Sequence, residues 1–135
     1  PSCLNMGPIG VLKDGVVLFN ALDAQGRDAG AWEVLDGSWA HPERTGQYHH
    51  HTVPEWIAPT TGNSHSDLVG YALDGFGIYG PLGTDGAPLS NSDLDVCHGH
   101  IHRIKWNGKN RSLYHYHATM EYPYTLGCYA GTPSD

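Results

Sequence analysis

Two stretches of the chain place apolar residues on both sides of an Asp-Gly pair, and each stretch predicts a β-hairpin with a tight turn. The first runs from Ile9 to Phe19 and the second from Val69 to Tyr79, at an offset of 60 residues. Helical patterns are rare. We expect one or two short helices, at Asp28–Leu35 with Asp28 as cap and at Ser90–Leu94 with Ser90 or Asn91 as cap. The chain is therefore predicted to be mainly β.

A second pattern combines aromatic and imidazole side chains. Tyr114-His115-Tyr116-His117 alternates strictly, and Tyr48-His49-His50-His51 is an earlier, less regular version. Because alternate side chains of a strand share one face, His115 and His117 are expected on one face and the two tyrosines on the other. His49 and His51 would pair in the same manner. Two neutral imidazoles side by side form a chelating pair for zinc, copper, iron or nickel.

These patterns repeat along the chain, which indicates a duplication. Asp36 precedes His41 by five residues, as Asp95 precedes His100; these motifs lie 59 residues apart, whereas the tetrads lie 66 apart. We predict two fused β repeats, at about 7–57 and 67–128, joined by a polar linker at about 58–66. They would pack about a pseudo-twofold axis as a single compact domain over residues 1–135, with the two histidine strands facing one another across a shared cleft.

The composition argues against several classes of partner. The formal charge is −7, from 7 basic and 14 acidic residues, which disfavours nucleic acid and anionic membrane surfaces because both need basic patches. No apolar run approaches the length needed to span a bilayer. The 18 glycines suit short strands and tight turns, and the ten histidines are the unusual feature of the composition. The candidate chemistry therefore lies with the histidines.

The cysteines, Cys3, Cys97 and Cys128, are odd in number, whereas exported proteins usually pair theirs. We expect a disulfide between Cys97 and Cys128. Cys3 would then pair with a segment outside this sequence or stay free.

The candidate metal ligands are the histidines of the repeated patterns, with a third ligand from each half beside the tetrad pairs: His49, His51, His115, His117, His41 and His100. Three histidines with an open coordination position would suit a catalytic metal. Asp36 and Asp95 have three interpretations, since they could orient a ligand histidine, bind a hard cation or cap a turn. His65, in the polar linker, and His102 are expected at the surface.

An all-nitrogen ligand set suits copper(II) best, with zinc as the alternative and iron, nickel or calcium less suited. We expect a protein that captures, stores or delivers the metal. One alternative is a small metalloenzyme, a copper oxidoreductase or a zinc hydrolase, in which an open coordination position activates dioxygen or water. Another is a structural β module whose histidines hydrogen-bond without metal. The sequence has no Gly-x-Ser-x-Gly or Gly-x4-Gly-Lys-Ser/Thr motif that would indicate another catalytic template.

Taken together, these motifs resemble the YHYH domain family. The resemblance is strong in the second half, where it is carried by Leu73–Pro81, Leu94–His100, Tyr114–Thr119 and Pro123–Cys128. It is weak in the first half, where Ser38 takes the place of Cys97 and His50 that of Tyr116. The resemblance implies an exported bacterial protein, secreted or periplasmic, and implies little about its chemistry. His98 departs from the family pattern, in which a polar amide is usual, so His98 is not expected to be a required ligand.

Overall fold

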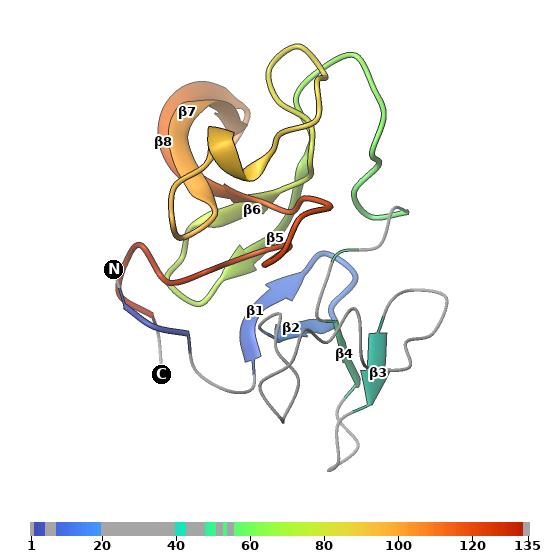
Figure 1. Ribbon diagram of the computed structural model, residues 1–135, viewed down its shortest axis with the longest axis vertical. Coiled ribbons are helices and arrows are strands. Elements are labelled where there is room, and N and C mark those ends of the chain that lie inside the picture. Colours follow the sequence, from blue (N-terminus) through green and yellow to red (C-terminus); the bar gives the residue numbers. More distant parts are fainter. Residues whose placement is uncertain are drawn as a thin grey trace.

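The structure, a computed structural model, describes residues 2–4, 8–19, 40–42, 48–50, 53 and 56–133, and at 40–42 and 48–50 it describes the backbone alone. Strands of these residues join in one mixed eight-stranded sheet (Figure 1). Their bounds are β1 Pro8–Leu12, β2 Val17–Phe19, β3 Ala40–Pro42, β4 Tyr48–His50, β5 Leu68–Ala72, β6 Gly77–Tyr79, β7 Gly99–Trp106 and β8 Lys109–His117. The prediction of a mainly β chain is confirmed.

Of the two predicted helices, the second is a single 3-10 turn. It spans Asn91–Asp93, and the backbone N–H of Ser90 donates to the carboxylate of Asp93 at 2.9 Å. The other predicted helix, at Asp28–Leu35, lies outside the described residues. Within the described ranges, no helix is both apolar enough and long enough to cross a membrane.

The strands follow the order β3-β4-β2-β1-β5-β6-β8-β7. The pairs β2–β4 and β6–β8 are parallel, and the other neighbours are antiparallel. Figure 1 shows the long hairpin of β7 and β8 curling at one end of the sheet, while β3 and β4 lie at the other end. The strands that carry the two histidine tetrads, β4 and β8, are therefore separated by four strands.

The strand pairings of the two halves correspond to one another. The matching pairs are Gly10–Leu18 with Gly70–Ile78, Leu18–His50 with Ile78–Tyr116, and His41–His49 with His100–His115. Between the halves, β1 pairs with β5 and places Val11 opposite Tyr71, two positions that lie 60 residues apart in the sequence. These registers support the idea of two fused repeats, which stays a prediction.

The hydrophobic core gathers apolar side chains from both hairpins with Tyr116 of β8. Its members include Ile9, Leu12, Leu18, Val69, Ile78, Tyr116, Leu126 and Tyr129. Cys97 belongs to this core and forms a disulfide with Cys128, as predicted, whereas Cys3 is a free and exposed thiol. The disulfide ties the segment before β7 to the C-terminal part of the chain.

Asp74 fixes the turn of the second hairpin and connects it to two other segments. Its Oδ1 accepts the N–H of Phe76 at 3.2 Å, and Gly75 has a φ of 88°, a left-handed conformation that glycine adopts without steric cost. Its Oδ2 accepts the N–H of Gly131 at 3.1 Å and the hydroxyl of Tyr116. One carboxylate therefore holds together the β5–β6 turn, β8 and the C-terminal segment.

Replacement of Asp74 by Ala is expected to lower the free energy of unfolding by about 3 kcal/mol, because the buried Tyr116 hydroxyl loses a charged acceptor. The matched control is Asp85→Ala, which removes the same bond to a turn N–H, that of Ala87, from an exposed carboxylate. We expect a loss of about 1 kcal/mol there. Urea unfolding of both variants measures the difference, and equal losses at the two turns would contradict the role assigned to Asp74.

Candidate metal centre

Strand β8 places two histidines on one buried face. His115 and His117 are both 0% exposed, and their ring centroids lie 4.8 Å apart. The rings of Tyr114 and Tyr116 contact each other at 5.4 Å, and Tyr116 belongs to the hydrophobic core. The strand therefore has the alternation that the tetrad predicted, with imidazoles on one side and phenols on the other.

Strand β7 adds a third histidine, at the position that the sequence repeat indicated. His100 pairs directly with His115 across the two strands. Its ring centroid lies 4.8 Å from that of His115 and 5.0 Å from that of His117. Its Nε2 is buried and has no hydrogen-bond partner among the described residues.

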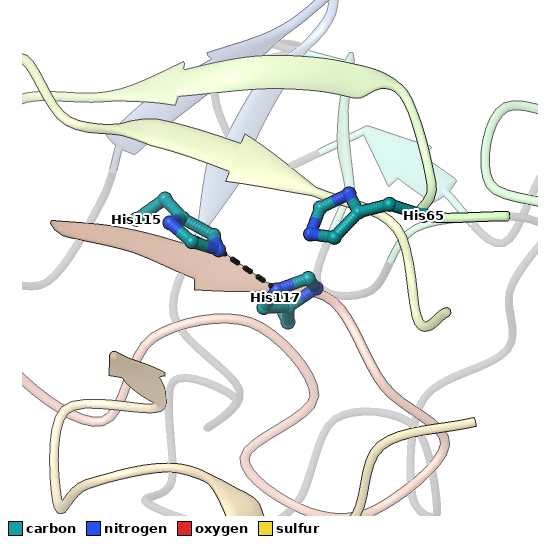
Figure 2. Close-up of side chains that lie close together, drawn as sticks. All are labelled: His65, His115 and His117. Carbon is teal, nitrogen blue, oxygen red and sulfur yellow. Dashed lines mark hydrogen bonds between the residues drawn. The ribbon is translucent and has the colours of Figure 1, made fainter. Parts of the chain in front are cut away.

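His65 is a fourth member of the cluster, although the sequence did not mark it as a candidate ligand. It comes from the segment that leads into β5, and Figure 2 shows its ring turned toward His115 and His117. The centroid of His65 lies 5.0 Å from that of His117 and 5.7 Å from that of His115. The repeat gave no signal for it, because the residue 60 positions earlier is Asn5.

The three rings of Figure 2 are oriented by backbone carbonyl oxygens. The Nδ1 atom of His65 lies 2.7 Å from the carbonyl oxygen of Ser66, that of His115 lies 2.8 Å from Leu113, and that of His117 lies 2.6 Å from Gly80. A carbonyl only accepts, so each Nδ1 carries a proton and donates it. Each neutral ring then has its lone pair on Nε2, and the Nε2 atoms point into the cluster.

His115 and His117 make three short contacts but carry only two protons when neutral. Two contacts join Nδ1 to a carbonyl oxygen, and the third joins the two Nε2 atoms at 3.0 Å. A third proton would make one ring cationic, but burial lowers the pKa of His115 to about 4 and that of His117 to about 2. At neutral pH one of the three contacts therefore lacks a proton, whichever tautomers the rings adopt.

A metal ion bound here would supply the positive charge that this contact lacks. Nitrogen ligands bound at about 2.0–2.1 Å to one zinc ion lie roughly 3.0–3.4 Å apart, and the Nε2 atoms of His115 and His117 are 3.0 Å apart. With His65, the three ligand atoms lie within 4.8 Å of one another. A shift of up to roughly 1.8 Å in the His65 ring would bring its ligand atom to that spacing. The carbonyls behind the rings fix the tautomer that metal binding needs.

The ring of Tyr79 packs against one side of this cluster. Its ring contacts His65 at 5.4 Å and His115 at 5.2 Å, and the side chain is 2% exposed. Its hydroxyl donates to the carbonyl oxygen of Lys105 at 2.8 Å. Burial raises the pKa of Tyr79 to about 12, so the phenol stays neutral and closes the cluster with its ring.

Asp95 makes the contacts of a turn cap, one of its three interpretations. Its Oδ1 accepts the N–H groups of Cys97 at 2.9 Å and Gly99 at 3.1 Å, and the hydroxyl of Tyr114 donates to the carboxylate at 3.0 Å. Asp95 thus fixes the turn that leads into β7 and bonds to a tyrosine on the opposite face from the histidines. The orienting role proposed for it is filled by backbone carbonyls instead.

The two remaining histidines near β7 lie outside the cluster. His98 is buried and fully bonded: its Nδ1 lies 2.7 Å from the carbonyl oxygen of Thr125, and its Nε2 lies 3.0 Å from Asn91 Oδ1 and 3.2 Å from Thr119 Oγ1. Both ring nitrogens therefore have partners in other segments, and the expectation that His98 is not a required ligand stays a prediction. His102 is exposed and stacks on His100 at 5.4 Å.

The side chains of the predicted ligands of the first half lie outside the part of the chain that the structure describes. His41 and His49 pair across β3 and β4, and nothing is described of their side chains, while His51 and Asp36 lie outside the described residues. Neighbouring strands are about 4.8 Å apart, so β4 and β8 are separated by roughly 24 Å across a flat sheet of this order. The expectation that the two histidine strands face each other across one cleft and share an ion is therefore wrong, because β2, β1, β5 and β6 intervene.

A comparison with protein families gives one match. The family model described as YHYH protein matches residues 2–88, which is more than half of the 135 residues. The match lies mainly in the half for which we expected the weaker resemblance, and it ends before the tetrad at Tyr114. Searches of curated proteins and of solved structures gave no match. The family match confirms the predicted family, and the chain belongs to the YHYH protein family.

Proposed function

We propose that this protein binds a transition-metal ion, copper in the first place, at a centre made of His65, His115 and His117, with His100 as the fourth imidazole. The observation that carries this proposal is the Nε2–Nε2 contact of 3.0 Å between two rings whose Nδ1 protons are already donated to carbonyl oxygens. A structural module in which these histidines only hydrogen-bond to one another would leave that contact without a proton.

The ligand chemistry supports copper, with zinc as the alternative. The cluster offers only imidazole nitrogen, which suits both ions. Calcium is a poor fit because it prefers oxygen ligands. Cys97 and Cys128 are joined in a disulfide, so these two offer no thiolate.

The burial of the centre supports capture, storage or delivery rather than catalysis. His115 and His117 have no exposed surface, and four imidazoles would saturate a four-coordinate ion. A metalloenzyme would need an open coordination position for water or dioxygen. The disulfide is consistent with a secreted or periplasmic location, which we propose with this function.

The first half is proposed to hold a separate site. His41 pairs with His49 in β3 and β4 as His100 pairs with His115 in β7 and β8. His41, His49 and His51 therefore remain predicted ligands, but of a second ion rather than of a shared one.

Titration of the metal-free protein with copper(II) tests the proposal. We expect binding at neutral pH, with nitrogen hyperfine splitting from imidazole ligands in the electron paramagnetic resonance spectrum; a parallel titration with zinc decides between the two ions. His65→Ala is expected to weaken binding at least about tenfold, since losing even a group that only orients a ligand weakens metal binding by about ten- to hundredfold. The control is Ser64→Ala at the exposed neighbouring position. Equal affinity of the two variants would remove His65 from the centre.

A further inference from the structure

Much of the positive charge of this acidic protein lies in the hairpin beside the histidine cluster. Four of the 7 basic residues belong to β7 and β8, and they are Arg103, Lys105, Lys109 and Arg111. All four are exposed, and no acidic residue occurs between Asp95 and Glu121. Like charges this close repel one another, so the hairpin favours an anionic ligand.

Two of these residues line a cleft that reaches His65. The cleft has a volume of about 620 Å³, which lies in the range of small-molecule sites, and Arg103 and Lys105 line it together with His65 and Thr84. A second cleft of about 310 Å³ shares the segment 64–67 and is lined by Lys13. The acidic residue that lines both clefts is Asp67, so among the described lining residues three basic side chains outnumber one carboxylate.

His65 is also the member of the histidine cluster that lines this cleft. It is partly exposed, whereas His115 and His117 are fully buried and do not line the cleft. Its Nε2 is itself buried and has no hydrogen-bond partner among the residues that the structure describes. An ion that enters through the cleft therefore reaches the ring of His65 before it reaches the other two.

We propose that this cleft docks small anionic chelates of the metal, in which carboxylate groups already hold the ion, and that His65 is the first protein ligand to bind it. This inference rests on the proposed metal-binding function and names the form in which the metal arrives. Arg103 and Lys105 would pair with the chelator's carboxylates, as guanidinium and ammonium groups do. The same two charges repel an uncomplexed cation, so the cleft discriminates between the two forms of the metal.

The transfer is a ligand exchange without redox chemistry. Each bond from the ion to a chelator oxygen breaks as a bond to an Nε2 nitrogen forms, first at His65 and then at His115 and His117. The rings are neutral and keep their Nδ1 protons on the backbone carbonyls, so the protein gives up no proton. The chelator leaves with its carboxylates ionised, and the oxidation state of the ion does not change.

Rapid-mixing kinetics test the proposal with two copper sources, copper(II) citrate and copper(II) in a non-coordinating buffer. The variant Arg103→Gln/Lys105→Gln is expected to take up copper from citrate about tenfold more slowly than the parent. A tenfold change lies at the low end of the rate enhancements that electrostatic steering produces. Uptake of uncomplexed copper should not be slower. The matched control, Lys109→Gln/Arg111→Gln, removes the same charge from the same hairpin outside the cleft, and it should keep the parent's rate.

The copper content at equilibrium should be equal for all three proteins, because none of the changes touches the histidines. Equal uptake rates of the two double variants from citrate, or equal slowing with both copper sources, would overturn the docking proposal. Failure of the parent protein to take up copper from either source would overturn the metal-binding function itself. These outcomes separate the two proposals.

Discussion

Replacing His115 and His117 together by Ala is expected to abolish metal binding at the second-half centre and to remove the thermal stabilisation that the metal gives. The Nε2 atoms of the two rings lie 3.0 Å apart at the middle of the cluster, and without them only His65 and His100 of the four imidazoles remain. A ligand present at about 1,000 times its Kd stabilises the folded state by about 4 kcal/mol, and the variant should show none of this gain from the centre. Metal analysis after dialysis and thermal unfolding with and without copper measure the two effects.

The matched control for this variant is His102→Ala, which removes an exposed histidine of the same hairpin. It should bind as many copper ions as the parent. Because the first half is predicted to hold its own ion, the triple change of His41, His49 and His51 to Ala should remove a different copper ion. A His115/His117 variant with the same copper content as the parent would show that β8 holds no metal.

The metal-free protein is expected to lose stability steeply as the pH falls from about 6.5 to about 4. Burial lowers the pKa of His115 to about 4 and that of His117 to about 2, whereas both titrate near 6.5 in the unfolded chain. Between these values the unfolded chain binds protons that the folded chain does not, so acid favours unfolding. Each of the two rings lowers the free energy of unfolding by up to about 1.4 kcal/mol for each unit by which the pH falls. For His115 this loss continues down to about pH 4, and for His117 it continues below that pH. At neutral pH this cost is absent.

Urea midpoints measured from about pH 7 to about pH 4 check this slope. The comparison protein is His115→Gln/His117→Gln, which cannot take up these protons and should show a shallower dependence. Part of the slope should remain, since burial also lowers the pKa of His98 and of His100. An identical slope in the parent and in the glutamine variant would contradict the neutral state assigned to the two buried rings.

Short sequence patterns predicted those structural features of this protein that depend on residues close together in the sequence. The Asp-Gly pair at Asp74 predicted the turn of the second hairpin, where a side-chain bond to Phe76 and the left-handed Gly75 need only residues next to one another. The alternation in Tyr114–His117 predicted which side chains share a face, because the two-residue period of a strand is a property of its backbone. The repeat of Asp-x4-His made His100 a candidate ligand, and the structure pairs this residue with His115.

Only the tertiary structure decided which distant segments meet. The sequence showed two histidine tetrads and suggested one shared ion, but the sheet joins the halves through β1 and β5 and so places β4 and β8 far apart. It also brought His65 from a polar connecting segment onto the imidazoles of β8, and no sequence signal indicated this because the residue 60 positions earlier is an asparagine. The side chains that share a strand face and the positions of tight turns can be predicted from a few neighbouring residues, because local backbone geometry decides both. Which strands lie next to one another depends instead on how the whole sheet buries its apolar surface.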